Sequence, residues 1–391
     1  MHQSRTVPSS VALRFVLIIG IANLFADMTY EGARSVTGAF LGSLGASAAV
    51  VGFTAGFGEL MGYGLRSAAG YLSDRTGRYW LLTIVGYVIN MLAVPGLALA
   101  GDWPLAAVLI VAERTGRAIR KPATEAMLSF AGKNIGTGWV FGLNEALDQA
   151  GATLGPLVVS LVLYLTGGYR TGFAVLLAPA LLTIIVVCAA RFFFPEPQRL
   201  ESGHGIQAQG FPKAYWLYLL AGCCIAAGFA DFALIAYHFE RTASIAVSLI
   251  PVFYSVAMAT GAVGALLLGK LFDRVGLPVL VVAIALSSLF APLVFWGSTW
   301  IALLGMVLWG IGMGAQESLF KAMIARLIAA QKRSTAFGIY DTAFGVAWFL
   351  GSALMGVLYA HSLATVIVLS VFLQLASLPF LVTAARVRRP G

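Results

Sequence analysis

The chain has 391 residues, of which 60% are hydrophobic and only 10% are charged. Globular proteins contain about 45–50% apolar and about 25% charged residues. So few polar groups cannot cover the surface of a soluble fold, and the composition therefore excludes a soluble enzyme. The high apolar content also excludes a disordered chain. The formal net charge of +9 is not read as a sign of a nucleic-acid partner, because its meaning depends on where the charges lie.

Twelve largely apolar stretches are long enough to cross a bilayer as helices, which takes about 20 residues each. The first stretch contains acidic residues and lacks a small-residue cleavage site, so it is not a cleavable signal. The expected spans, in chain order, are residues 13–37, 46–71, 80–100, 105–129, 138–166, 170–194, 213–237, 244–270, 277–296, 300–325, 334–360 and 363–385.

The loops between these spans differ strongly in charge. With both termini placed in the cytoplasm, the inside segments carry 16 Lys and Arg residues, and the outside loops carry only Arg170 and Arg241. Cytoplasmic loops of membrane proteins are enriched in Lys and Arg, so this asymmetry predicts cytoplasmic termini. The net charge is therefore a topology signal, and the expected partners are a lipid bilayer and a small-molecule substrate, with no nucleic acid.

No motif for catalysis or for holding a metal ion is present. The three cysteines fall in apolar spans, and the four histidines are scattered near helix ends and loops. A disulfide framework and a metal site are therefore not indicated. There is no P-loop, no His-Glu-x-x-His and no Ser-His-Asp set, so we expect a non-enzymatic protein without a cofactor.

Three short patterns recur in the same order in the two halves of the chain. A repeat of this kind suits alternating access, in which two bundles rock about a site in the middle of the membrane. The alternative is an ancient duplication with no present role. The paired patterns are Phe25–Asp27 with Phe229–Asp231, Gly70–Arg78 with Gly269–Gly276, and Phe141–Glu145 with Phe337–Asp341.

The repeat predicts two six-helix bundles in tandem. The first covers residues 1–194 and the second covers residues 213–391, and a cytoplasmic linker of residues 195–212 joins them. We expect an all-α membrane protein of twelve helices that works as a monomer.

At these motifs the chain resembles the major facilitator superfamily over nearly its whole length. Gly70–Arg78 is similar to the family motif between the second and third helices, and Gly269–Gly276 is its weaker echo. Gly151–Pro156 is similar to the core of the family's antiporter motif, although Val159 and Ser160 stand where paired glycines often follow. The resemblance implies a secondary transporter of a bacterial inner membrane, similar to drug/proton antiporters, with helices 1, 4, 7 and 10 lining a cavity.

Gly151 and Gly155 lie on one face of the fifth span, and Pro156 follows them. Two glycines four residues apart allow another helix to approach closely. A proline inside a helix frees a backbone carbonyl and can bend the helix. The pattern therefore predicts either a hinge or simple tight packing.

Seventeen charged residues lie inside the expected spans, and none of them is in the third, ninth or twelfth span. Such residues are costly in hydrocarbon and usually face a cavity or a partner. Two neighbouring carboxylates in a poor solvent repel each other, so one of them can hold a proton and release it on the other side. The alternative is a structural ion pair with Arg34 or a helix-4 arginine. The candidates for proton coupling are Asp27, Glu31, Glu59 and Asp148.

The fourth span carries several arginines, which bind carboxylate or phosphate through two parallel bonds. These arginines either contact an anionic substrate or join a buried polar network with nearby acids. The second half has aromatic residues instead, which either line the site or pack. The candidates for substrate binding are Tyr30, Arg34, Glu113, Arg114, Arg117, Asn144, Glu145, Asp231, Trp309, Tyr340 and Trp348.

The family resemblance implies that Asp74 and Arg78 tie the cytoplasmic helix ends together with an acid near the end of the fourth span, which is Glu125 here. Arg66 is a further candidate for this gate, which would stabilise an outward-facing state. The full set of gating candidates is Gly70, Asp74, Arg75, Arg78, Glu125, Gly151, Gly155, Pro156 and Asp273.

These expectations combine into one functional hypothesis with two alternatives. The first is proton-coupled export of a small amphipathic organic solute. The alternatives are a carrier for organic anions that uses Arg114 and Arg117 as a clamp, and a lipid flippase with a site for an anionic head group.

Overall fold

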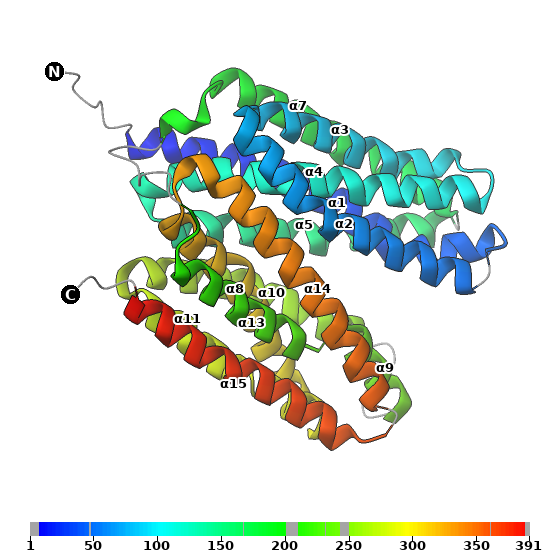
Figure 1. The fold of residues 1–391 in the computed structure, drawn as a ribbon. Helices are drawn as coiled ribbons and strands as arrows, with labels where there is room; N and C mark the ends of the chain where they lie inside the picture. The colour runs from blue at the N-terminus through cyan, green and yellow to red at the C-terminus, as the bar shows by residue number, and fades with distance from the viewer. Residues whose placement is uncertain are drawn as a thin grey trace. The chain divides into compact units, whose positions relative to one another are not determined.

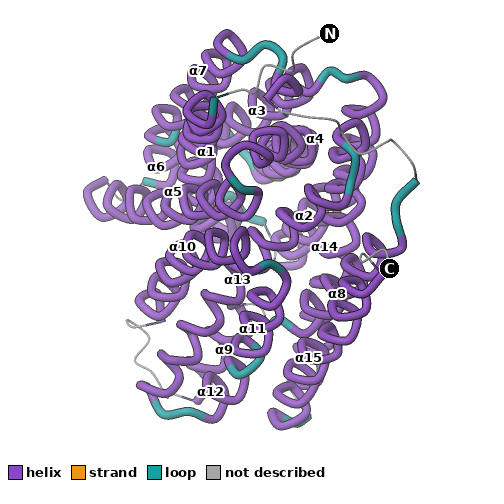
Figure 2. The backbone as a smooth tube through the Cα atoms, turned by 90° about the vertical axis from the view of Figure 1, so that its left-hand side faces the viewer, coloured by secondary structure: helices purple, strands orange, loops and turns teal. Residues whose placement is uncertain are grey.

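The computed structural model describes residues 8–46, 48–166, 168–200, 210–230, 232–242, 250–359 and 361–387. In these ranges all regular structure is helical (Figures 1 and 2). Helices suit a bilayer because their backbone polar groups are satisfied within the segment. The α-helices are α1 (Ser9–Ser43), α2 (Ala48–Thr76), α3 (Tyr79–Gly96), α4 (Trp103–Ile135), α5 (Thr137–Thr166), α6 (Tyr169–Val175), α7 (Leu177–Phe193), α8 (Lys213–Gly228), α9 (Phe232–Thr242), α10 (Ile250–Val275), α11 (Leu277–Ser287), α12 (Phe290–Trp296), α13 (Thr299–Leu327), α14 (Arg333–Tyr359) and α15 (Leu363–Val387). Short 3₁₀ turns cover Leu97–Leu99, Pro197–Leu200 and Ala330–Lys332.

Nine helical segments among the described residues are long and apolar enough to cross a membrane. They correspond to α1, α3, α5, α6 with α7, α10, α11 with α12, α13, α14 and α15. The remaining three expected spans correspond to α2, to the charge-rich α4, and to α8 with α9. The count of twelve therefore stays a prediction, whereas the all-α membrane fold is confirmed.

The expected seventh span, residues 213–237, is not one continuous helix. The helix α8 ends at Gly228, and Phe229 has extended backbone angles of φ −89° and ψ 108°. The next helix, α9, begins at Phe232. This break leaves backbone groups that must find partners elsewhere, and those partners come from other helices, as described below.

The expected ninth span, residues 277–296, is also interrupted, because a turn at Ser288 and Leu289 separates α11 from α12. The expected sixth span, residues 170–194, is interrupted at Leu176 between α6 and α7.

The chain forms two compact units, and each unit contains one segment from the other half of the sequence. Unit 1 comprises Met1–Ile135, Leu147–Ala208 and Ala329–Thr342. Unit 2 comprises Gly136–Ala146, Gln209–Ile328 and Ala343–Gly391. The start of α14 thus packs with unit 1, and the start of α5 packs with unit 2.

Unit 1 is built on α4, which packs against α1, α2 and α3, while α7 packs against α1 and α3. The helix α5 joins this unit from Leu147 onward. A Cβ atom at Gly151 would overlap the carbonyl oxygen of Leu24 in α1, and one at Gly155 would overlap that of Met28. These glycines therefore serve tight packing of α5 on α1, which is one of the two predicted roles.

Unit 2 is built on α13, which packs against α10, α11 and α12, while α15 packs against α8 and α11. A Cβ atom at Gly310 or Gly314 of α13 would overlap backbone oxygens of α10. The apolar core of this unit includes Phe229, Phe290 and Trp309. Small residues on α13 thus bring α10 close enough to bury this core.

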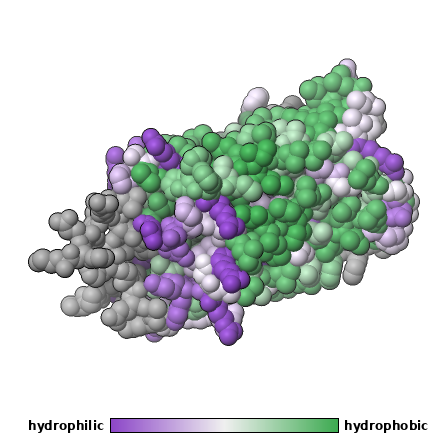
Figure 3. Space-filling view, turned by 90° about the horizontal axis from the view of Figure 1, so that it is seen from above, coloured by the Kyte–Doolittle hydropathy of each residue, from purple (hydrophilic) through white to green (hydrophobic). Residues whose placement is uncertain are grey.

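Large apolar side chains such as Leu60, Leu157 and Phe372 are exposed. Figure 3 shows one face of the molecule, on which hydrophobic residues form a broad band and hydrophilic residues gather toward the ends. A surface of this kind is expected where a protein faces lipid tails.

Candidate functional site

The centre of unit 1 contains a charged group shared by α1 and α4. The guanidinium carbon of Arg117 lies 4.2 Å from the ring centroid of Tyr30. Asp27 and Tyr30 are buried and lie three residues apart on α1, so they share a face. Asp27 lies within electrostatic range of Arg117, Arg120 and Glu31. A buried acid, a half-buried base and a buried aromatic ring thus form one cluster.

A hydrogen-bonded network adjoins this cluster and involves α3. The Tyr87 hydroxyl and the Arg120 guanidinium both donate to the side-chain oxygen of Asn23, the latter at 3.2 Å. Arg120 also stacks on the Tyr87 ring at 4.2 Å. Asp148 of α5 lies within electrostatic range of Tyr87, and this brings a fourth helix to the network. Asn23 and Tyr87 were not among the predicted site residues.

A second residue of α3, Asn90, was also missed. Its side-chain amide donates to the Glu113 carboxylate at 2.9 Å, and Glu113 also lies 3.2 Å from the Arg114 guanidinium. The helices α3 and α4 approach closely here because Gly116 has no side chain, and a Cβ atom there would press on the backbone of Asn90. The third span carries no charge, so the search for charged residues could not have found Tyr87 and Asn90.

The other acidic candidates of the first half lie in different surroundings. Glu31 forms an ion pair with Arg34 at 3.4 Å, in which the Arg34 side chain is 50% exposed. Such exposed pairs are weak. The helix α2 contains Glu59, but its side chain lies outside the described part of the structure.

Asp74, near the end of α2, caps the start of α14. Its carboxylate accepts hydrogen bonds from the backbone N–H of Ser334 at 3.3 Å and of Thr335 at 2.6 Å, and from the Tyr79 hydroxyl at 2.8 Å. Asp74 lies beyond the expected span 46–71. Burial raises the pKa of Asp74 above its ordinary value, and the hydrogen bonds oppose this effect. We call Asp74 with these two N–H groups the α14 latch.

Asp273, the repeat partner of Asp74, caps the start of α5 in the same way within unit 2. Its carboxylate accepts hydrogen bonds from the N–H groups of Gly138 at 2.9 Å and of Trp139 at 2.7 Å, and it also pairs with Arg326. Gly136 has a positive φ of 100°, and a side chain there would overlap Asp273. A carboxylate at a helix N-terminus is favourable for both hydrogen bonding and the helix dipole. We call Asp273 with these two N–H groups the α5 latch.

Glycines allow the close approach that both latches require. In unit 1, a Cβ atom at Gly70 would overlap the carbonyl oxygen of Ser334. In unit 2, Gly138 and Gly269 lie against each other, and a Cβ atom on either would overlap the carbonyl oxygen of the other. The predicted motif glycine Gly70 therefore has a packing role next to the acid that it precedes.

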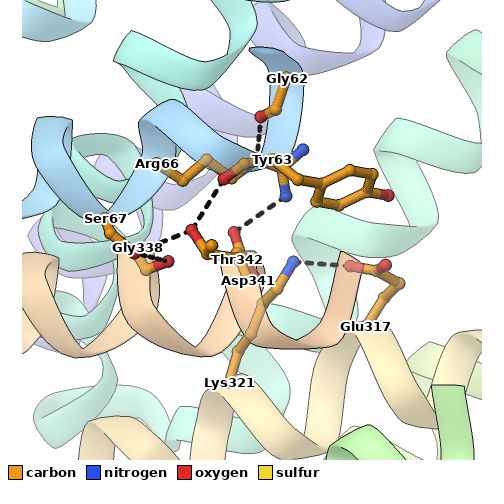
Figure 4. Close-up of polar contacts among 9 residues, drawn as sticks. All are labelled: Gly62, Tyr63, Arg66, Ser67, Glu317, Lys321, Gly338, Asp341 and Thr342. Atoms are coloured by element: carbon orange, nitrogen blue, oxygen red, sulfur yellow. Dashed lines mark hydrogen bonds and ion pairs between the residues drawn. The ribbon is translucent and has the colours of Figure 1, made fainter. Parts of the chain in front are cut away.

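A buried ion pair lies further along α2 and α14 (Figure 4). Arg66 donates to Asp341 at 3.1 Å and to the carbonyl of Gly62 at 2.9 Å, and each ion-pair side chain is only 6% exposed. Thr342 donates to the carbonyl of Tyr63, and Ser67 donates to Thr342. This set of contacts joins α2 to the first part of α14 within unit 1.

The chain matches the Major Facilitator Superfamily over residues 19–352 and again over residues 218–391. The chain belongs to the Major Facilitator Superfamily. It is 38% identical to an uncharacterized protein of Mycobacterium tuberculosis over 381 residues, which is 95% of this chain and 93% of the relative. It is 25% identical to an uncharacterized transporter of this superfamily from Methanocaldococcus jannaschii over 362 residues, which is 89% of each chain.

Solved structures show the same fold. A bacterial homologue of the iron transporter ferroportin, in an outward-facing state, matches with a TM-score of 0.75 at 13% identity, over 95% of this chain and 99% of the other. The human organic anion transporter matches with a TM-score of 0.76 at 14% identity, over 95% and 99%. These similarities show the fold, and membership of the superfamily identifies the chain as a transporter and not an enzyme.

The aromatic candidates of this major facilitator belong to packed cores. Trp309 is 2% exposed, and its ring N–H donates to the carbonyl of Ala230 at 2.9 Å, beside the break between α8 and α9. The ring of Phe229 lies 5.3 Å from that of Trp309 and 5.7 Å from that of Trp348. Tyr340, in unit 1, is 3% exposed. A direct role for these rings in substrate binding stays a prediction.

The remaining candidates are placed as follows. Asn144 and Glu145 belong to the part of α5 in unit 2, and Glu145 is buried. Asp231 lies outside the described residues. Pro156 lies inside α5, and Arg75 lies in the last turn of α2.

The tie between Arg78 and Glu125 stays a prediction. Arg78 is exposed, whereas Glu125 is buried at 5% exposure. Arg333 is 3% exposed and donates to Ser129 of α4 at 3.3 Å. Arg333, in the first turn of α14, thus joins the start of this helix to α4.

Proposed function

We propose that this major facilitator is a proton-coupled secondary transporter that exports a small amphipathic organic solute by alternating access. The observation that carries the proposal is the buried Asp27 carboxylate within electrostatic range of the half-buried Arg117 and of the buried Arg120. An ionisable residue inside a membrane marks a pathway for substrate or proton. Asp27 is therefore the first choice for the coupling residue.

The coupling follows from the charges of this cluster. When Asp27 is ionised, it attracts Arg117, which is also held over the Tyr30 ring. When a carboxylate oxygen of Asp27 takes up a proton, that attraction is lost and Arg117 is free to contact a solute or to shift along α1. Proton and solute then act on the same charged group, which is the requirement for coupled transport.

The two latches supply the gate in this proposal. Asp74 and Asp273 each hold the first N–H groups of a helix, and these contacts must open when the transporter exposes its site to the other side. Through these contacts the start of α14 packs within unit 1 and the start of α5 packs within unit 2. We assign the latches to one end state of the transport cycle.

The location and the assembly of the transporter rest on the sequence. The excess of Lys and Arg in alternate loops supports cytoplasmic termini. The resemblance of the motifs is the basis for proposing a bacterial inner membrane. The predicted bundles, residues 1–194 and 213–391, would each carry one copy of the latch acid. We propose a monomer, coupled only to protons.

Transport in proteoliposomes tests the role of Asp27. Ligands are first selected from amphipathic cations, anions and neutral compounds by the rise in melting temperature that they cause. With a pH gradient imposed, Asp27→Asn is expected to abolish concentrative movement and to retain part of the solute exchange. Asp102→Asn is the matched control, because Asp102 is exposed and caps α4, and asparagine caps equally well. Normal concentrative transport by Asp27→Asn would refute the proposal.

A second candidate function is an organic-anion carrier. Arg117 stacks on Tyr30, and no carboxylate of the described residues lies within ion-pair distance of it, so its donors suit an anionic group. The fold similarity to the human organic anion transporter is consistent with this class. Arg117→Ala would then abolish the rise in melting temperature caused by anions and keep the rise caused by cations. Arg117→Lys would retain only part of the rise caused by anions.

A further inference from the structure

A cavity opens at one end of unit 1, away from the charged cluster of α1 and α4. Its volume is about 440 Å³. Its walls are the turn between α2 and α3, the first turn of α3, and the end of α7 with the segment that follows it. The residues that line it are Gly77, Arg78, Tyr79, Trp80, Leu81, Arg191, Pro195, Pro197 and Gln198.

The charge of this cavity is positive. Arg78 and Arg191 line it, both are exposed, and no acidic residue is among the lining residues. The acid of the neighbouring segment, Glu196, pairs with Arg199 at 2.5 Å. The acid of the preceding helix, Asp74, is occupied by the α14 latch. Two arginines therefore line the cavity, and no acidic residue is part of its wall.

The wall of the cavity is held together by a specific contact. The indole N–H of Trp80, in the first turn of α3, donates to the carbonyl of Phe194 at 2.9 Å. This bond fixes the segment after α7 against α3, and α3 and α7 also pack along their lengths. At the start of α3 the N–H groups of Leu81 and Leu82 donate to the carbonyl of Arg78. The N–H groups before them carry a partial positive charge, which adds to that of the arginines.

Apolar side chains surround the rim on the surface. Phe192 is 81% exposed and Phe193 is 67% exposed, directly after Arg191, and Leu81 of α3 is 46% exposed. In a membrane protein, exposed apolar residues of this size face acyl chains. A ligand at this place can therefore present an anion to the cavity and hydrocarbon to the rim.

We propose that this cavity binds the phosphate of an anionic phospholipid headgroup, from the leaflet that the loop charges predict to be cytoplasmic. Arg78 and Arg191 bind the phosphate oxygens, the start of α3 adds backbone donors, and the acyl chains lie along Leu81 and Phe192. Arginine suits a phosphate because its guanidinium can donate two parallel bonds. The proposal concerns a lipid that stays bound and is independent of the transported solute.

The bound lipid would act on the α14 latch through Tyr79. This residue of the first turn of α3 lines the cavity, and its hydroxyl donates to Asp74 at 2.8 Å. A headgroup that orders the start of α3 also fixes the position of Tyr79. The Tyr79 hydroxyl in turn orients the Asp74 carboxylate of the latch. Lipid binding is therefore expected to stabilise the latched state.

Native mass spectrometry of the purified full-length protein tests the site. Dioleoyl phosphatidylglycerol and dioleoyl phosphatidylcholine are compared, since they share acyl chains and differ in headgroup charge. The wild type is expected to bind phosphatidylglycerol at least about tenfold more tightly, and Arg78→Gln with Arg191→Gln is expected to lose this preference. Arg274→Gln with Arg386→Gln removes the same two charges from the last turns of α10 and α15, and this control is expected to keep the preference.

Three results would overturn the proposal. The first is a wild type without preference for phosphatidylglycerol, and the second is a double variant that keeps the preference. The third is inorganic phosphate displacing the lipid without need of acyl chains, which would assign the cavity to a free anion. If the double variant does not fold, the wild type is photo-crosslinked with a photoreactive phosphatidylglycerol. The proposal then predicts crosslinks in residues 77–81 and 191–198. Labels confined to other helices would refute the site.

Discussion

Single residues decide where the helices of each unit touch most closely. Gly155 lies against the carbonyl of Met28, and Gly116 lies against the backbone of Asn90. In both places a methyl group would overlap a backbone atom of the neighbouring helix. Since lipid is as apolar as the helices, close van der Waals packing is a main source of helix association in a membrane. These glycines are therefore expected to matter more for stability than an average apolar residue.

Gly155→Ala is expected to destabilise the protein by about 1–3 kcal/mol, because the added methyl group forces α5 away from α1. The melting temperature in detergent measures the effect. Gly64→Ala in α2 is the matched control, since nothing lies within 4 Å of a Cβ atom at that position. The control is expected to be neutral or slightly stabilising. Equal melting temperatures for the two variants would contradict the packing role.

The buried pair of Arg66 and Asp341 allows a double-mutant cycle. Arg66→Met leaves the Asp341 carboxylate buried without its partner, which costs about 3–5 kcal/mol for a pair of this kind. Asp341→Leu likewise leaves the Arg66 guanidinium buried without its partner. The combined variant removes both charges and is expected to be more stable than either single variant, as measured by chemical unfolding. Additive losses would show that the two charges do not depend on each other.

At the scale of whole helices, the break between α8 and α9 is the largest departure from a regular span. The carbonyl of Gly228 accepts hydrogen bonds from Ser370 at 2.6 Å and from Gln374 at 3.4 Å, both in α15. The carbonyl of Ala230 accepts one from Trp309. A break in a membrane helix is tolerated only where such partners satisfy the backbone. The polar residues of α15 therefore explain how the break is stabilised.

Ser370→Ala is expected to lower the free energy of unfolding by about 1–2 kcal/mol, because it removes a donor from the buried Gly228 carbonyl. Ser377→Ala is the matched control, since this equally buried serine donates only to Gln374 of its own helix. The control is expected to have a smaller effect, measured by thermal unfolding. An equal loss in both variants would argue against a role of Ser370 in holding the break.

At the scale of the whole molecule, both units use the same device at the start of a helix. Asp74 in unit 1 and Asp273 in unit 2 occupy matched positions of the sequence repeat, and each binds two successive backbone N–H groups. The repeat is thus preserved in contacts and not only in residue types. This argues against a duplication without a present role.

Asp74→Asn and Asp273→Asn are each expected to loosen their own latch. Each latch carboxylate uses both of its oxygens, one for each N–H group, and asparagine has only one acceptor oxygen. The labelling rate of an introduced cysteine by maleimide measures this, with reporters Thr335→Cys for the α14 latch and Trp139→Cys for the α5 latch. The three native cysteines are first replaced by alanine. Each aspartate variant is expected to raise labelling of its own reporter several-fold.

The crossed pairs are the control for this experiment. Asp74→Asn should leave the Trp139→Cys reporter less affected than Thr335→Cys, and the converse should hold for Asp273→Asn. Equal labelling of both reporters in either variant would mean that the effect is global and that the latch contacts are not local.

The candidate site was predicted in part. Asp27, Arg117 and Tyr30 were found because intramembrane charges are rare and because residues three or four apart share a helix face. Asn23 and Tyr87 were missed, since uncharged polar residues in an apolar helix are common and their partners lie on other helices. Neither the burial of Arg333 nor the exposure of Arg78 followed from loop position alone.

Composition, span length and loop charge were enough to predict a helical membrane protein, and the motifs were enough to predict its family. These are local properties, because the length and apolarity of a segment decide whether it can cross a bilayer. The break in the expected seventh span and the contact of Asp74 with Thr335, which are 261 residues apart, were visible only in the folded chain. Such contacts depend on which helix faces meet, and the close approach of two backbones is not encoded within either segment.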